Sequence, residues 1–161
     1  MKQSQPKTLP WSWERSLGWR GQLERMHRWM DRLNELTGTT RLDEILDFLL
    51  AFFIAAYHLR DWLLRENPNI RTDLDALFAN SKSLRLCADI ANVAKHYDLT
   101  QQPRARSQFS FAREYAGPNQ GWFGADARLT MLTPDHKEDV LDLAVKCEVD
   151  WTAFLSQQGL I

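Results

Sequence analysis

Two groups of polar residues in this sequence have the types and spacing that acid–base chemistry requires. The first group lies near the end of a long apolar segment and consists of His58, Arg60 and Asp61. The second group consists of Asp89, Asn92, Lys95 and His96. His58 and Asp61 are three positions apart, which makes them neighbours on one face of a helix. Each group can therefore present an imidazole beside a carboxylate.

The second group has a regular helical spacing. Asp89, Asn92 and His96 follow one another at steps of three and four, so they form one polar line on a helix whose other positions are mostly apolar. Burying such groups costs a few kcal/mol unless they find partners. We therefore predict that this line faces the interior or a second subunit. Stacked on the first group, it would form one pocket with two histidines, two carboxylates and an amide.

This set of side chains is suited to cleaving RNA without a metal ion. The reaction needs a base for the 2′-hydroxyl, an acid for the leaving oxygen and a cation for the charge on phosphorus. Imidazole titrates near neutral pH, so His96 is the predicted proton-transfer residue. Asn92 or Asp89 would orient the imidazole. The phosphate charge would be stabilised by Arg60, Lys95 or His58.

Other interpretations of the same residues stay open. The line can face solvent, or Asp89 and Asn92 can be structural partners of Arg60 or of loop backbone. The chain would then be a non-catalytic protein-interaction module. A metal-binding bundle is a further alternative, but the sequence lacks the Glu-x-x-His pairs of carboxylate-bridged bundles and three spaced histidines. We predict neither a metal site nor a cofactor.

The line Asp89-x-x-Asn92-x-x-Lys95-His96 within a helical bundle resembles the HEPN superfamily of prokaryotic nucleotide-binding and RNase domains. The resemblance implies a homodimeric endoribonuclease of the kind found in toxin–antitoxin and phage-defence systems, with RNA or a partner protein as its target. Such domains place two copies of an Arg-(4 to 6 residues)-His motif face to face. His96 matches the motif histidine. No arginine stands at 89–91, and Arg60 or Lys95 is the expected substitute.

An extended arm is predicted between about residues 100 and 132. Helical periodicity is lost there, and the spacing favours a β-hairpin of 107–115 with 122–131. The arm mixes cations with aromatic rings, which can hold phosphates and stack bases or form a protein interface. We expect an interface or dimer contact first and nucleic acid second. The residues expected to bind are Arg104, Arg106, Phe109, Phe111, Arg113 and Trp122.

The elements that must position these residues are helices. Apolar spacing and caps predict four long helices at about 13–36, 41–66, 83–97 and 134–157, and a short helix at 72–79. Thr133-Pro134 has the form of a helix start. The predicted fold is all-α, an up-and-down bundle with an extended insertion before the last helix. We expect residues 1–12 to form a flexible tail and 13–161 a single domain.

Composition sets the remaining limits. The chain has 161 residues, of which 44% are hydrophobic and 25% charged, as in globular proteins. Twenty basic residues against 21 acidic ones give a net charge of −1, which argues against a polyanion-wrapping protein. The apolar run Phe48–Tyr57 is about half the length of a membrane span, and Cys87 and Cys147 have no metal spacing. We expect a cytoplasmic protein with reduced cysteines, no signal peptide and no membrane partner.

Overall fold

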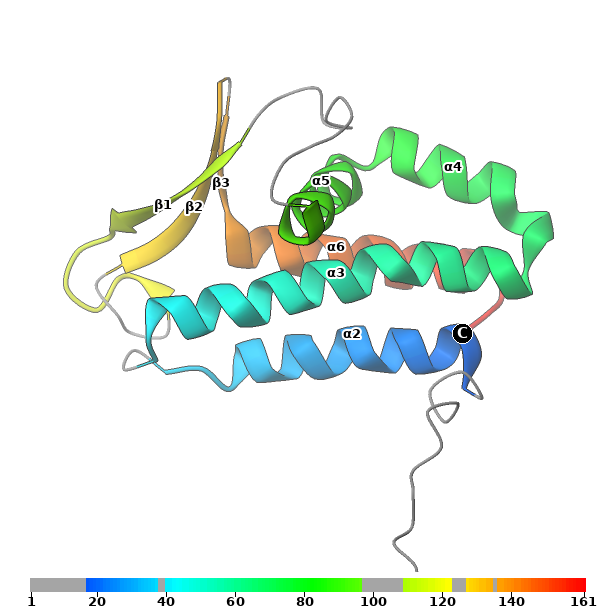
Figure 1. Ribbon diagram of the computed structural model, residues 1–161, viewed down its shortest axis with the longest axis horizontal. Helices are drawn as coiled ribbons and strands as arrows, with labels where there is room; N and C mark the ends of the chain where they lie inside the picture. Colours follow the sequence, from blue (N-terminus) through cyan, green and yellow to red (C-terminus); the bar gives the residue numbers. More distant parts are fainter. Residues whose placement is uncertain (1–16, 38–39, 97–108, 123–126, 135) are drawn as a thin grey trace, which may run out of the picture.

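The computed structural model describes residues 17–37, 40–96, 109–122, 127–134 and 136–161. Along these residues, helices are followed by a small sheet and then by a last helix (Figure 1). In chain order, the elements are α2 (Gly18–Asn34), α3 (Leu42–Glu66), the 3-10 turn η1 (Pro68–Ile70), α4 (Arg71–Asn80), α5 (Lys82–His96), β1 (Ser110–Tyr115), β2 (Ala127–Thr133), β3 (His136–Asp139) and α6 (Val140–Gln157). The predicted helical fold with an extended insertion is confirmed at this level. The predicted tail at 1–12 lies outside the described residues.

Helices α2 and α3 form an antiparallel pair. The apolar residues of α2 that recur at steps of four and three are all buried: Trp19, Leu23, Met26, Met30 and Leu33. The Gln22 side chain donates to the carbonyl of Ala55, 2.8 Å away, inside this contact. Gly18 has φ +57°, and a Cβ at this position would lie 2.1 Å from Glu66 Oε1. The glycine therefore lets the end of α3 approach the start of α2, where Glu66 accepts from the Trp19 amide.

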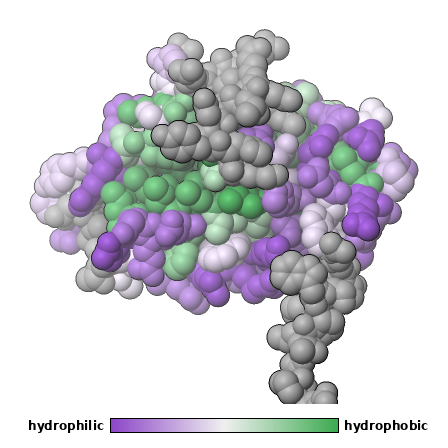
Figure 2. Space-filling model, in the orientation of Figure 1, coloured by the Kyte–Doolittle hydropathy of each residue, from purple (hydrophilic) through white to green (hydrophobic). Residues whose placement is uncertain are grey.

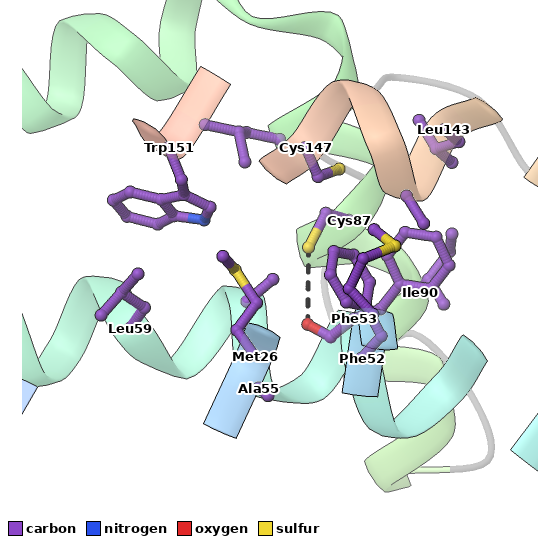
Figure 3. Packing of buried hydrophobic residues seen from close by; sticks show 14 of the residues in the cluster. Met26, Phe52, Phe53, Ala55, Leu59, Cys87, Ile90, Leu143, Cys147 and Trp151 are labelled. Atoms are coloured by element: carbon purple, nitrogen blue, oxygen red, sulfur yellow. Dashed lines mark hydrogen bonds between the residues drawn. The ribbon is translucent and has the colours of Figure 1, made fainter. Parts of the chain in front are cut away.

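The core lies where α2, α3, α5 and α6 meet. Figure 3 shows Met26 of α2, Phe53 of α3, Cys87 of α5 and Trp151 of α6 converging there. All four are at most 1% exposed. Both cysteines are free and buried, and each thiol donates to a backbone carbonyl of a neighbouring helix: Cys87 to Phe53, and Cys147 to Ser83. The predicted core cysteines are confirmed.

The arrangement of the helices differs from the predicted up-and-down bundle of four long helices. In Figure 1, α2, α3 and α6 run across the view, whereas α5 is seen almost end-on and crosses α3. Helix α4, of ten residues, corresponds to the short helix predicted at 72–79, and the η1 turn connects it to α3. The sequence periodicity showed which faces of each helix are apolar, but it does not fix the crossing angle between two helices.

The insertion is a three-stranded antiparallel sheet in the order β1-β2-β3. Ser110–Tyr115 pairs with Ala127–Thr133, and each strand boundary lies within five residues of the predicted hairpin. The predicted helix start at Thr133-Pro134 is wrong. The chain turns there and forms β3, and α6 begins only at Val140, where Asp139 caps the Leu141 and Asp142 amides. Proline is tolerated both in the first turn of a helix and in a turn between strands. Here the pairing of β3 with β2 makes it a turn residue.

Among the described residues, no helix has the length and hydropathy needed to cross a membrane.

Candidate functional site

The C-terminal half of α5 carries the polar line predicted from the sequence. Asp89 is 1% exposed, and it has an interaction partner. Asn92, almost one turn later, is half-buried. The helix continues to His96, but the side chains of Lys95 and His96 lie outside the described part of the chain. The line thus starts in the interior and leads toward the end of the helix.

Helix α5 is held against the middle of α3. The Cys87 thiol lies 3.4 Å from the Phe53 carbonyl oxygen, and Ile90 is buried. In Figure 1, α5 is seen nearly end-on where it crosses α3. Helix packing in the core therefore sets the position of the polar line.

The first predicted group is divided between two sides of α3. Residues 58 and 60 are about 200° apart around a helix, so their side chains leave α3 in nearly opposite directions. Arg60 lies toward α4, where Nη2 is 2.8 Å from Asp75 Oδ1 and the guanidinium lies over the Phe78 ring. His58 is half-buried with its ring 6.4 Å from that of Tyr57, and the Asp61 side chain is 65% exposed.

This placement limits which residues of the first group can bind phosphate. Arg60 is engaged with Asp75 and with Asp61, 3.6 Å from its Nη1, and its side chain is 19% exposed. It ties α4 to α3 instead of standing free as a cation. His58 stays on the other side of α3, and Asp61 lies between the two, about 60° from His58 around the helix and in contact with Arg60. Of the predicted phosphate-binding side chains, Lys95 and His58 remain.

The described residues of the arm mainly pack against the core. Phe109 and Phe111 pack on one another with ring centroids 5.6 Å apart, and both pack against the core. Trp122 is 9% exposed, and its indole N–H donates to Asp139, 2.7 Å away. Trp122 is therefore mostly buried and held by Asp139, and its role in binding stays a prediction. Arg113 is exposed as expected, and Arg104 and Arg106 lie outside the described residues.

A second polar cluster was not predicted. It lines a cleft of about 520 Å³ between the start of α5, β3 and α6. Ser81 and Ser83 both donate to the Asp150 carboxylate, and Ser81 also caps the Leu84 amide. Glu138 accepts from Lys146 and contacts His136 at 2.5 Å and Lys82 at 3.5 Å. We call these residues, Ser81, Lys82, Ser83, His136, Glu138, Lys146 and Asp150, the cleft cluster.

Glu138 is the electrostatic centre of the cleft cluster. Burial by itself would raise the pKa of its carboxyl group. Hydrogen bonds from Lys146 and His136, with the charges of Lys146 and Lys82, outweigh burial and lower the pKa to about 2. The same hydrogen bond raises the pKa of Lys146. The cations of this cluster thus surround Glu138, the Asp150 carboxylate accepts from the two serines, and the cluster joins β3, α5 and α6.

This cluster was not predicted because residues 134–139 were assigned to the last helix. In a strand, residues two apart lie on the same face, so β3 places His136 and Glu138 side by side. A helix over 134–157 would have put these two residues about 200° apart. The Ser81 cap alone was visible in the sequence.

Among the described residues, no group of three or more His, Cys, Asp or Glu side chains is placed to hold a metal ion. Comparison with known proteins finds no matching family model, no matching curated protein and no matching solved structure.

Proposed function

We propose that this chain is a HEPN-like protein that cleaves RNA without a metal ion, at a site formed by the C-terminal half of α5. The observation that carries the proposal is the burial of Asp89 to 1% exposure on the same helical line as half-buried Asn92. A carboxylate is costly to bury unless it is paired, and Asp89 has a partner. Asn92, one turn before His96, is at the spacing at which side chains meet on a helix, and the buried Asp89 lies one turn further back on the same line.

In this mechanism His96 removes the proton of a 2′-hydroxyl group. The 2′-oxygen attacks the adjacent phosphorus, and the bond from phosphorus to the 5′-oxygen breaks. A protonated imidazole returns a proton to the leaving oxygen, with His58 as the candidate donor. Asn92 or Asp89 orients His96, and Lys95 stabilises the charge on phosphorus. The products are a 2′,3′-cyclic phosphate and a 5′-hydroxyl. The resemblance further implies a homodimer and a role as a toxin or in phage defence.

The test is cleavage of an end-labelled oligoribonucleotide in the presence of EDTA. Loss of general acid–base catalysis costs about 10²–10⁴-fold, so His96→Ala should lower the cleavage rate by about that factor with unchanged circular dichroism. His27→Ala is the matched control, because that imidazole is on α2 beside Glu148 of α6. Equal rates for His96→Ala and the parent, or loss of cleavage in EDTA, would refute the proposal.

A second candidate function is that of a non-catalytic interaction module. It is favoured by the apolar surface over α3 in Figure 2 and by Val145 and Val149, which are 44% and 59% exposed on α6. The cleavage assay separates the two functions. An interaction module leaves RNA intact. If α6 forms its contact surface, Val145→Lys with Val149→Lys would reduce the mass of the homodimer, measured by light scattering, to that of a monomer.

A further inference from the structure

We propose that the edge of α2 formed by Arg25, Arg28, Trp29 and Arg32 binds a single-stranded nucleic acid. We call these four residues the arginine edge. The inference deepens the proposed function, because it locates the surface that would deliver RNA to the site. Its physical basis is independent, since it uses side chains of α2 and not of α5.

The arginine edge has a defined side on α2. The Trp29 ring lies 5.8 Å from that of Phe48 of α3, which places Trp29 on the flank facing α3. His27 lies 3.8 Å from Glu148 of α6, on the opposite flank. Residues 25, 29 and 32 follow one another at steps of four and three and therefore share one side of α2. The edge is thus turned away from α6.

The edge itself carries three arginines, and carboxylates lie along one flank of it. The acidic residues Glu24, Asp31 and Glu35 leave the helix about 60° to 120° away from Arg25 and Arg32. Arg28 lies between the two sets, with Nη1 3.9 Å from Glu24, and its side chain is 55% exposed. An exposed ion pair at that distance is weak and screened by salt. The phosphates of a nucleic acid strand can therefore compete for Arg28.

The aromatic ring gives the edge a second type of contact. The Arg32 guanidinium lies over the Trp29 ring, 4.7 Å from its centroid, and Arg32 is exposed. A planar guanidinium stacked on indole presents its outer face to solvent, where a nucleic acid base can stack. Single strands offer unpaired bases for such stacking, whereas a duplex does not. Arginines that bind phosphate beside a stacking platform favour a single strand over an acidic peptide.

The edge continues toward the candidate site along α3. Phe48, Ala51, Ala55, His58 and Trp62 follow one another at steps of three and four and form one stripe. Phe48 contacts Trp29, so His58 lies about 15 Å along α3 from the edge. Figure 2 shows hydrophilic side chains along the margin of this face, where α2 runs, beside the apolar surface of α3. The stripe thus connects the edge to His58, the second imidazole of the proposed site.

The test measures binding of a fluorescent 12-residue oligouridine by anisotropy, with the full chain carrying His96→Ala so that the probe stays intact. Arg28→Gln with Arg32→Gln should weaken binding at least tenfold at low salt. It should also flatten the slope of log K against log salt concentration by about 1.4, or 0.7 for each lost phosphate contact. Arg41→Gln with Arg71→Gln is the control, because both arginines are exposed on other elements and the charge change is the same.

The outcomes separate this inference from the proposed function. Equal weakening by both double variants, absence of binding by the parent, or equal competition by polyglutamate would overturn the arginine edge. If the parent cleaves RNA and the edge variants bind normally, the cleavage proposal stands and the edge fails. If His96→Ala protein binds through the edge and the parent does not cleave, the edge stands and the cleavage proposal fails.

Discussion

The two ends of α5 use polar residues in different ways. At its start, Ser81 and Ser83 share the Asp150 carboxylate, and Lys82 joins Lys146 and His136 around Glu138. Toward its end, Asp89 is buried and Asn92 is only half-buried. The first end is fastened to β3 and α6 by complementary charges. The second end leads a polar line out of the core.

The difference indicates that the polar groups at the start of α5 serve stability, whereas those toward its end serve both stability and function. The cleft cluster balances its cations and carboxylates, so its removal should change stability and leave chemistry untouched. The polar line contains a buried carboxylate on an apolar helix, and its removal should change both. Three substitutions test this division, and a fourth, at Glu148, tests the contact between α6 and α2; they follow in order of expected effect.

Replacing Asp89 by Ala should lower the free energy of unfolding by about 3 kcal/mol, because the partner of a buried carboxylate is left unpaired. Urea denaturation measures this change. Asp61→Ala is the matched control, since that carboxylate is 65% exposed and its loss should cost less than about 0.5 kcal/mol. A cost below about 1 kcal/mol for Asp89→Ala would mean that the polar line contributes little to the fold.

Replacing Asp150 by Ala should cost about 2 kcal/mol, because the Ser81 and Ser83 hydroxyls lose their common acceptor. The melting temperature should fall, while RNA cleavage per folded molecule stays as in the parent. A specific loss of cleavage below the melting transition would place the cleft cluster in the active site and remove the contrast between the two ends of α5.

The Glu138 carboxyl group should make stability depend on acid pH. Its pKa is lowered from 4.5 to about 2, so its contribution is complete above about pH 5 and is lost as the pH falls toward 2. Glu138→Gln should therefore cost about 1–2 kcal/mol at pH 6, with the cost shrinking to near zero at pH 2. Denaturation of parent and variant side by side measures this difference. A cost that does not vary with pH would show that the cations do not stabilise the ionised carboxylate.

Replacing Glu148 by Gln should stabilise the protein slightly at pH 7. Burial is the main reason that the pKa of Glu148 is raised, with Asp31 adding to it and His27 opposing it. A raised pKa of an acid means that the folded state disfavours its charged form, so the benefit of a neutral side chain is largest at high pH. We expect about 0.5 kcal/mol at pH 7, vanishing below pH 4. Destabilisation at pH 7 would instead make the ion pair with His27 the stronger effect.

Elements with strong local signals could be predicted from the sequence. The apolar stripe of α2, the long apolar helix α3 and the Ser81 cap of α5 follow from residue spacing and hydrogen-bonding groups near in sequence. The third strand could not be predicted in this way. His136–Asp139 is a strand because it pairs with Thr130–Thr133, and its own four residues carry no period long enough to reveal it.

The site residues divide in the same manner. That Asp89, Asn92 and His96 share one line is a property of helical spacing, and so it was available from the sequence. The opposite directions of His58 and Arg60 were also implied by spacing, but the choice of Asp75 as the Arg60 partner depends on where α4 folds back. Burial of Trp122 depends on the sheet closing against α6.

The sequence by itself determined the helical class, the apolar face of each long helix and the helical line from Asp89 to His96, because periods of three and four residues are set within one segment. Only the tertiary structure decided the crossing of α5 over α3, the third strand, and the meeting of Ser83, Glu138 and Lys146 in one cleft. These features depend on contacts between residues that are far apart along the chain. Such contacts are chosen by packing and by complementary charge, and no local pattern encodes them.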